Sequence, residues 1–370
     1  MTQQWGQQQP GQPAWGASPQ PWSQAQPAWG RPVAAPPGQP TGYQPGGYPP
    51  PPPPPPGGNS PVKLVLLGLV LVIAVGFFAF SLTSYLNRAE VAGTLPQIGE
   101  TSAPPTGVPE PDLNPSKWPI PTDGTQAEQW LVDNPLYQQS VQVPVNCTVG
   151  RFNPKTISPE QLQQELTVLS GCLMMVWTEP MERAGFELPR PPVTTYSQPI
   201  TTACGDSETH NAFYCTLDQR IYYATDFYEV FYLSDPSAVD NEFQVANIMG
   251  HEFGHALQAR AGIWAAYAGF KAGASKEGAL ELGRRSETQA DCFSGMFLNA
   301  VAQASRMTDT DRVETADVSQ GIGDDELSGD PDYVSDHGTG KARRTWFETG
   351  NRNALAGSCN TWNAPSDQVR

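Results

Sequence analysis

Residues 247–257 constrain this chain more than any other stretch, because they hold the pattern H-E-x-x-H between residues that favour helix. Positions four apart share one face of an α-helix, so His251 and His255 are expected to point the same way. Two such imidazoles can chelate one divalent metal ion, and neutral imidazole suits zinc. Glu252 could reach a water molecule at that metal and accept its proton. The competing interpretation is a buried helix with chance histidines, which the total of four His disfavours.

A second pattern supplies the further ligand that such a site needs. Glu287 and Asp291 are also four residues apart, and the apolar Phe293, Met296 and Phe297 follow them in a predicted helix. Glu287 would complete a His-His-Glu site and leave the fourth position for water, as in catalytic zinc sites. Asp291 would accept the second N–H of a ligand imidazole. Alone, an E-x-x-x-D pattern would instead indicate the solvated acidic face of a helix.

The two motifs together resemble the gluzincin arrangement, in which thermolysin-like peptidases use H-E-x-x-H and a later E-x-x-x-D. The chain is more closely similar to a bacterial family of neutral zinc metallopeptidases of the cell envelope. The stretches that carry this resemblance are A-C-G at 203–205, A-F-Y-C-T-L-D at 212–218, and His337, Gly338 and Thr339 leading to Arg343, Trp346 and Phe347.

This resemblance covers about residues 125–365 and has consequences for fold and chemistry. It implies an α+β, mainly helical, zincin-like metallopeptidase domain with a small edge sheet. It also implies a zinc ion held by His251, His255 and Glu287, and peptide hydrolysis with Glu252 as the base.

The resemblance also concerns His337 and one strand. His337 is either a donor to the oxyanion of the transition state or a structural hydrogen-bonding residue, and both interpretations stay open. A helix is predicted after it over residues 341–350, with Thr339 as a possible cap. Residues 214–217 and 220–223 are predicted strands. In gluzincin-like folds a strand lines the cleft and pairs with extended substrate, and we assign Ile221, Tyr222 and Tyr223 to that edge.

Local signals predict where one long helix begins and which of its residues are core. Ser158 as N-cap, Pro159 in the first turn and Gln161 as the capping-box partner mark its start. Its apolar stripe ends before Pro180 and is expected to be core. The stripe consists of Leu162, Leu166, Leu169, Leu173 and Val176.

The limits of the two motif helices follow from similar signals. Asp240 is the expected cap of the first, which should run to about Ala261 with Gly262 just beyond its end. Residues 262–283 are rich in Ala and Gly and are expected to cover the cleft or turn back. The second helix is expected to continue to about Ser305.

Two further polar stretches receive no catalytic role. Residues 309–336 are acidic and could bind calcium, but they lack calcium-loop spacing, so a solvated loop is the favoured interpretation. His210 lies in a polar stretch between two cysteines and is interpreted as a surface residue.

The N-terminal third differs in composition from the rest of the chain. Residues 1–61 are rich in Gln, Pro, Gly, Ala and Trp, with an unbroken proline run at 49–56, which predicts a disordered tail. The tail is either a spacer, which we favour, or a ligand for a proline-recognising partner. Residues 62–86 contain an apolar run long enough to cross a bilayer as one helix. Residues 87–124 are predicted to be a Pro-rich linker to a domain at 125–370.

Charge and cysteine placement predict the orientation of the chain. Residues 1–63 contain the basic Arg31 and Lys63 and no acidic residue, whereas the whole chain has a net charge of −16. This distribution favours a single-pass protein of the cell membrane with a cytoplasmic N-terminus and an extracytoplasmic C-terminal domain. The acidic domain also argues against a nucleic-acid partner.

All six cysteines lie at or after Cys147, as expected for an oxidising compartment. We predict three disulfides. The first pair is the safest, since ten residues separate its cysteines around a predicted hairpin entry. With the other two pairs, the set is one of the fifteen possible pairings of six cysteines. The pairs are Cys204–Cys215, Cys292–Cys359 and Cys147–Cys172.

Two functions from different classes fit these observations. The leading one is a membrane-anchored zinc peptidase that hydrolyses a peptide or protein substrate in the cell envelope. The alternative is a non-catalytic binding or scaffolding protein of the envelope with a structural or vestigial metal site. Glu252 favours the enzyme, because a structural site has no use for a base beside the metal. Cys292 points about 100° away from Asp291 on the helix, so it suits a disulfide better than a fourth ligand position.

Overall fold

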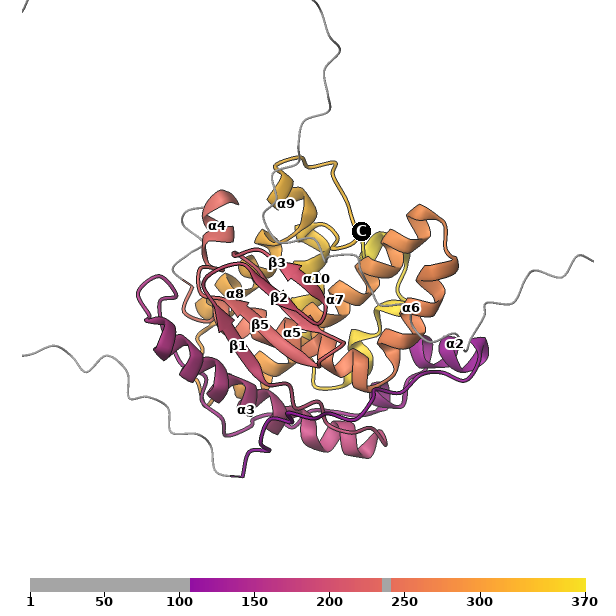
Figure 1. Ribbon diagram of the computed structural model, residues 1–370, viewed down its shortest axis with the longest axis horizontal. Helices are drawn as coiled ribbons and strands as arrows, with labels where there is room; N and C mark the ends of the chain where they lie inside the picture. The colour runs from indigo at the N-terminus through magenta and orange to yellow at the C-terminus, as the bar shows by residue number, and fades with distance from the viewer. Residues whose placement is uncertain (1–106, 235–240) are drawn as a thin grey trace, which may run out of the picture. The chain divides into compact units, whose positions relative to one another are not determined.

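The computed structural model describes residues 107–234 and 241–370, which fall in one compact unit and include both metal-site motifs (Figure 1). The predicted tail (1–61), the predicted membrane-spanning segment (62–86) and most of the predicted linker (87–124) lie outside the described residues. Among the helices of the described ranges, none combines the length and the apolar character needed to cross a bilayer.

Helices make up most of the described domain. The α-helices are α2 (Gly124–Val132), α3 (Pro159–Arg183), α4 (Glu229–Ser234), α5 (Gln244–Arg260), α6 (Ile263–Gly273), α7 (Lys276–Val301), α8 (Asp309–Gly321), α9 (Asp324–Ser328) and α10 (Gly340–Asn351). The 3-10 helices are η1 (Pro135–Gln138), η3 (Ala356–Cys359), η4 (Thr361–Asn363) and η5 (Ser366–Gln368). The strands are β1 (Val193–Tyr196), β2 (Ile200–Thr202), β3 (Gly205–Ser207), β4 (Ala212–Cys215) and β5 (Arg220–Ala224).

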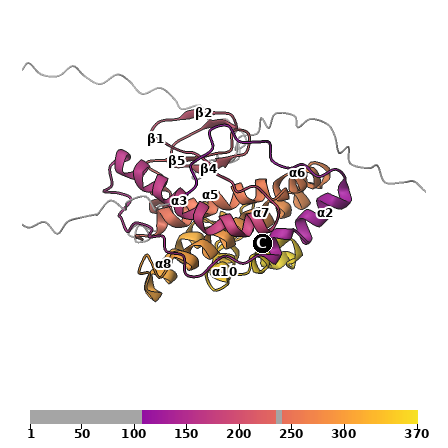
Figure 2. The ribbon, with the colours of Figure 1, turned by 90° about the horizontal axis from the view of Figure 1, so that it is seen from below.

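The strands lie on one side of the layer that contains α3, α5 and α7 (Figure 2). They form a three-stranded sheet and a separate two-stranded sheet. The fold is therefore mainly helical α+β with small sheets, as the resemblance implied.

The larger sheet has the strand order β1-β5-β4. β5 pairs in parallel with β1 (Val193 opposite Ile221) and antiparallel with β4 (Tyr214 opposite Ile221). The assignment of Ile221, Tyr222 and Tyr223 to the edge was wrong, because β5 is the central strand. The edge strand that packs against α5 is β4, which begins two residues before the predicted strand at 214.

Helix α3 begins as predicted. The capping box of Ser158 and Gln161 is present, and the apolar stripe is buried in the core. Pro180 lies inside the helix, which continues to Arg183 beyond the end of the stripe. Met181 is fully buried, and this burial offsets the backbone hydrogen bond that a proline removes.

Helices α5 and α7 cross in very close contact, because α5 presents glycine where α7 approaches. Every residue of α5 is buried, as expected for a helix surrounded by other elements. A Cβ atom built on Gly250 would lie 2.6 Å from Ser294 Oγ, and one on Gly254 would lie 2.9 Å from Ala290 Cα. Side chains at these two positions would hold the helices further apart.

The ends of the motif helices differ in part from the predictions. Gly262 follows α5 in the left-handed conformation (φ 74°), as predicted for the residue beyond a helix end. The N-cap of α5 is Phe243, so the expected cap at Asp240, which lies outside the described residues, was wrong. α7 ends at Val301 rather than near Ser305.

Residues 262–283 are helical, and of the two expectations for them the turn back is confirmed. They form α6 and the first turns of α7, because Ser275 accepts a hydrogen bond from Gly278 N and starts a new helix there. The chain does reverse between α5 and α7, with α6 as a helix in between.

The acidic stretch 309–336 is helical over much of its length, so the favoured solvated loop was wrong there. Thr308 and Asp311 form a capping box at the start of α8, and acidic side chains near a helix N-terminus favour the helix. His210 lies at the surface, as predicted, with 38% of its side chain exposed and Nε2 2.8 Å from Glu229 Oε2.

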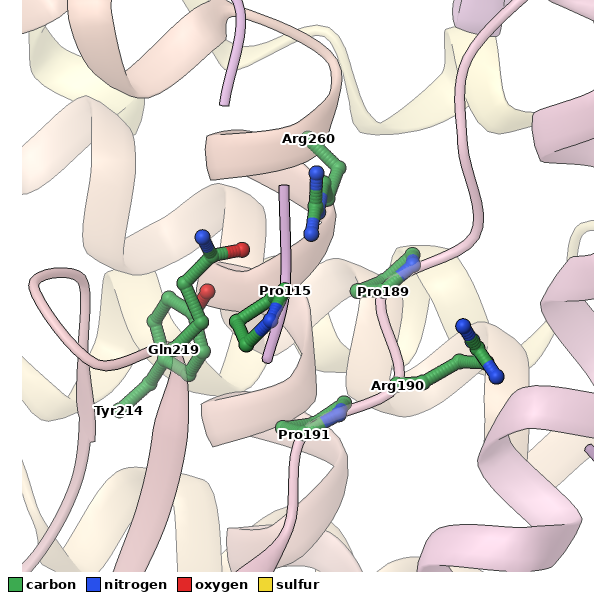
Figure 3. Close-up of a pocket in the computed structure, with 7 residues that line it drawn as sticks. All are labelled: Pro115, Pro189, Arg190, Pro191, Tyr214, Gln219 and Arg260. Carbon is green, nitrogen blue, oxygen red and sulfur yellow. The ribbon is translucent and has the colours of Figure 1, made fainter. Parts of the chain in front are cut away.

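An extended segment before α2 packs against the domain, although its proline content indicated a linker. Gln219 Nε2 donates a hydrogen bond to the carbonyl oxygen of Ser116 (2.8 Å). Figure 3 shows Pro115 among the residues that line a small cavity, with Gln219 on one side of it and Pro189 on the other. None of the residues that line this cavity belongs to the two metal-site motifs.

All three predicted disulfides are present. They are Cys147–Cys172, Cys204–Cys215 and Cys292–Cys359, with sequence separations of 25, 11 and 67 residues. The third connects α7 to η3 and thereby ties the C-terminal segment to one of the motif helices.

The close approach of α5 and α7 predicts the effect of one added methyl group. Gly254→Ala should lower the free energy of unfolding by about 1–3 kcal/mol, because the new Cβ would meet the Ala290 backbone and force the helices apart. Urea unfolding of the purified protein measures this change. The matched control is Gly273→Ala, since a Cβ at that position would meet no other part of the described residues within 4 Å, its own stretch of helix aside. Equal stability of the two variants would contradict the prediction.

Candidate metal centre

Three candidate ligands converge where α5 crosses α7. The Nε2 atoms of His251 and His255 are 3.2 Å apart. Glu287 Oε2 lies 3.2 Å from His251 Nε2, and its Oε1 lies 3.5 Å from His255 Nε2. All three offer an atom within 4.8 Å of the others, and across residues 107–234 and 241–370 this is the only such group of His, Cys, Asp or Glu.

The side chains of the cluster are buried to different extents. The His251 side chain is 2% exposed, whereas that of Glu287 is 17% exposed. Of these two side chains, that of Glu287 is the more exposed to solvent.

Asp291 lies behind His251, as the sequence predicted. His251 Nδ1 is 2.8 Å from Asp291 Oδ1. Asp291 also accepts two hydrogen bonds of 2.9 Å from the guanidinium of Arg343, whose side chain is fully buried in α10. Breaking a buried ion pair of this kind costs about 3–5 kcal/mol, so Arg343 holds Asp291 firmly against the histidine.

The charges of this group shift one another's protonation. Burial by itself would lower the pKa of His251, but the charge of Asp291 and the hydrogen bond to it raise that pKa to about 10. Burial would raise the pKa of Glu287, yet the neighbouring histidines hold it well below its usual value. Asp291 therefore favours a proton on Nδ1 of His251, and the Nε2 atom of the same ring faces Glu287.

His255 has a different kind of partner on its outer side. Its Nδ1 lies 2.9 Å from Oε1 of Gln258, one turn further along α5. The Trp264 ring of α6 lies edge-on to the imidazole, with 5.8 Å between ring centroids. His255 is thus held by an uncharged amide and an aromatic wall.

Glu252 points toward the edge strand of the sheet. Its Oε2 accepts a hydrogen bond of 2.8 Å from the backbone N–H of Tyr214 in β4. Burial raises the pKa of Glu252, and the charges of the two histidines act against that rise. A carboxylate with a raised pKa is a better proton acceptor.

His337 lies near the cluster in the loop before α10. Its Nδ1 is 3.5 Å from Asp324 Oδ1, and 20% of its side chain is exposed. Its charge contributes to the low pKa of Glu287. Asp324 also accepts the backbone N–H groups of Ser335 and Gly338 and so shapes this loop.

The residues present fit a zinc ion. Glu287 Oε2 is buried and makes no hydrogen bond of good geometry to any residue in the described ranges, so its contact with His251 leaves it available. Two imidazole nitrogens and one carboxylate oxygen are a donor set of catalytic zinc sites, which keep one position open. His251, His255 and Glu287 would hold the ion.

Sequence reasoning missed several residues of this site. Gln258 carried a usable signal, because it lies three residues after His255 on the same helical face. Arg343 and Tyr214 lie in stretches that carry the family resemblance, but no role in the site was predicted for them, and Asp324 was assigned to a solvated loop. Each reaches the site from a segment distant in sequence.

Comparison with known proteins places this geometry in a family. Residues 140–362 match the family described as "Putative neutral zinc metallopeptidase". The chain is 28% identical over 217 residues to the uncharacterized protein YpfJ of Escherichia coli K12, which covers 56% of this chain and 75% of YpfJ. It is 27% identical over 192 residues to the uncharacterized protein Rv2575 of Mycobacterium tuberculosis H37Rv, covering 47% of this chain and 63% of Rv2575. No solved structure matches the chain.

The matched region contains every residue of the cluster described above. It spans more than half of the chain, from before α3 to η4. On this evidence, the chain belongs to this zinc metallopeptidase family.

Proposed function

We propose that this protein is a zinc-dependent peptidase that hydrolyses peptide bonds in proteins or peptides of the cell envelope. The observation that carries the proposal is the convergence of His251, His255 and Glu287 beside Glu252. Family membership supports the same reaction class. A purely structural zinc site would not need a buried carboxylate next to the cluster, held in place by a backbone N–H.

In the proposed reaction, the zinc ion and the residues of the protein have different roles. Zinc held by the three ligands would polarise the scissile carbonyl and make water a stronger acid. Glu252 takes the proton from the attacking water and later passes it to the leaving amine. The Tyr214 N–H holds one oxygen of this carboxylate, so the side chain keeps its direction during both transfers.

Two further elements take supporting roles in the proposal. An extended substrate pairs with the edge strand β4, because backbone hydrogen bonds bind peptides without regard to their side chains. His337 is proposed to donate to the carbonyl oxygen as it gains negative charge. Asp324, on the Nδ1 side of His337, supports that orientation.

We also propose that the protein is anchored in the cell membrane with this domain outside the cytoplasm. The apolar run within residues 62–86 and the basic, acid-free residues 1–63 motivate this topology. The three disulfides agree with it, because disulfides persist in oxidising compartments.

The ligand set predicts which variants lose metal. His255→Ala and Glu287→Ala should retain little zinc after dialysis, and Asp291→Ala should bind it about 10–100-fold more weakly because His251 loses its support. Metal analysis of the dialysed proteins measures this. Glu277→Ala is the control, because this carboxylate lies on the same helix with 76% of its side chain exposed. Full zinc content in Glu287→Ala would exclude that residue as a ligand.

If Glu252 is the base, its substitution should lower the rate of hydrolysis without affecting the fold. Glu252→Gln keeps the shape but cannot accept a proton, so it should retain zinc and lose peptide hydrolysis by about 10²–10⁴-fold. Glu160→Gln, at an exposed position of α3, should hydrolyse like the wild type. His337→Ala should cost about 10²-fold if it donates to the oxyanion, and almost nothing if it is structural.

The rates are measured with a broad peptide pool, with and without a chelator. A zinc-loaded, oxidised wild-type protein that cleaves nothing in this pool would favour the scaffolding function instead.

The topology predicts the result of limited proteolysis. Protease added to intact cells or spheroplasts should remove the C-terminal domain, because that domain is expected outside the membrane. A cytoplasmic marker protein that stays intact shows that the membrane is sealed. Loss of the N-terminal tail alone would reverse the proposed orientation.

A further inference from the structure

A chain of buried hydrogen bonds leads from His255 to the C-terminal segment. It passes through Gln258 on α5 and Gln289 on α7, both fully buried. Gln258 Nε2 donates to Gln289 Oε1 (3.1 Å). Gln289 in turn accepts from Trp362 Nε1 (3.3 Å) and donates to the carbonyl oxygen of Cys359 (3.0 Å).

At the far end of this series of hydrogen bonds, each group can only donate or only accept. An indole N–H can only donate, and a backbone carbonyl can only accept. If the amide of Gln289 were reversed, its NH₂ would face the Trp362 N–H and its oxygen would face the Cys359 carbonyl. Both contacts would be repulsive, so the orientation of Gln289 is determined. Gln289 Nε2 also donates to the Tyr137 hydroxyl (2.9 Å).

The orientation of Gln258 follows from that of Gln289. Gln258 Nε2 donates to two acceptors, the carbonyl oxygen of Ser286 (2.8 Å) and Gln289 Oε1. Reversal would place the Gln258 oxygen against both of these oxygens. Gln258 Oε1 therefore faces His255 Nδ1, and it also accepts from the Ser286 hydroxyl (3.1 Å).

The last link sets the tautomer of the histidine. Because Gln258 Oε1 can only accept, the His255 nitrogen opposite it must carry the proton. A neutral His255 then has its lone pair on Nε2, the atom that faces His251 Nε2 and Glu287 Oε1. A metal ligand needs that lone pair, and fixing the tautomer in advance favours binding.

We propose that Gln258 and Gln289 are positioning residues for the metal site. The donor of Trp362 and the acceptor of Cys359 fix the orientation of the Gln289 amide. Gln289 in turn fixes the orientation of Gln258, which fixes the tautomer of His255. The C-terminal segment would thereby influence the zinc affinity of a ligand that lies more than a hundred residues earlier in the chain. This inference depends on the proposed zinc site, because it assigns His255 Nε2 to the metal. The disulfide between Cys292 and Cys359 keeps the anchoring carbonyl beside α7.

The first test is the tautomer itself in the full-length wild-type protein. With zinc removed by a chelator and at a pH where His255 is neutral, ¹⁵N NMR of histidine-labelled protein should show the proton on Nδ1. The chain contains only four histidines, so single His→Gln variants can assign the signals. A proton on Nε2 of neutral His255 would overturn the proposal, whatever the fate of any variant.

The second test measures the zinc affinity of three glutamine variants by competition with a chelator. Gln258 and the control Gln244 lie on α5, and Gln289 lies on α7. Gln258→Leu should weaken zinc binding by about 10–100-fold and should populate the Nε2–H tautomer of His255. Gln289→Leu should act in the same direction with a smaller loss. Gln244→Leu should change neither quantity, because the buried Gln244 amide in the first turn of α5 makes no hydrogen bond within the described residues.

Failure of this inference can be told from failure of the proposed function. Zinc binding by Gln258→Leu within twofold of the wild type would overturn the positioning role while leaving the zinc site intact. A wild-type protein that binds no zinc would instead contradict the proposed function. The tautomer of His255 would then be the remaining test of the hydrogen-bond chain.

Discussion

The direct contact between α5 and α7 is the constraint on which the rest of the structure depends. Gly250 and Gly254 remove the side chains that would otherwise separate the two helices. Only at that separation can Glu287 reach both imidazoles while Asp291 reaches the back of His251. The same glycines cost helix stability in isolation, and the complete burial of α5 offsets this cost.

The two histidines are supported in opposite ways. His251 rests against Asp291, which forms a buried ion pair with Arg343. The charge of Asp291 favours the protonated form of His251, and the charge of Arg343 opposes it. His255 rests against neutral amides that determine its tautomer without adding charge. A carboxylate behind both imidazoles would add another buried negative charge beside Glu287, and desolvation makes such charges costly. Placing a carboxylate behind one histidine and an amide behind the other limits the charge in the core while orienting both imidazole rings.

Local sequence patterns predicted well what depends on a few neighbouring residues. The capping box at Ser158, the glycine end of α5 and the grouping of His251 with His255 are all of this kind. Predictions that needed information about packing were less successful. Local sequence did not show that α3 continues through Pro180 to Arg183, with Met181 buried directly after the proline. The predicted edge strand, β5, is central, and β4 lies at the edge, because a strand's place in a sheet depends on which other strands pair with it.

The sequence by itself determined the spacing of the ligands along two helices, the presence of a base beside the first of them, and the six cysteines that pair. Helical periodicity is a local property, so these features can be read without knowing the fold. Only the tertiary structure decided which distant groups complete the site: the N–H of Tyr214, the guanidinium of Arg343 and the glutamine chain that ends at Trp362. Each of these contacts joins segments far apart in the sequence, and hydrogen-bond direction and burial, which decide their roles, exist only once the chain has folded.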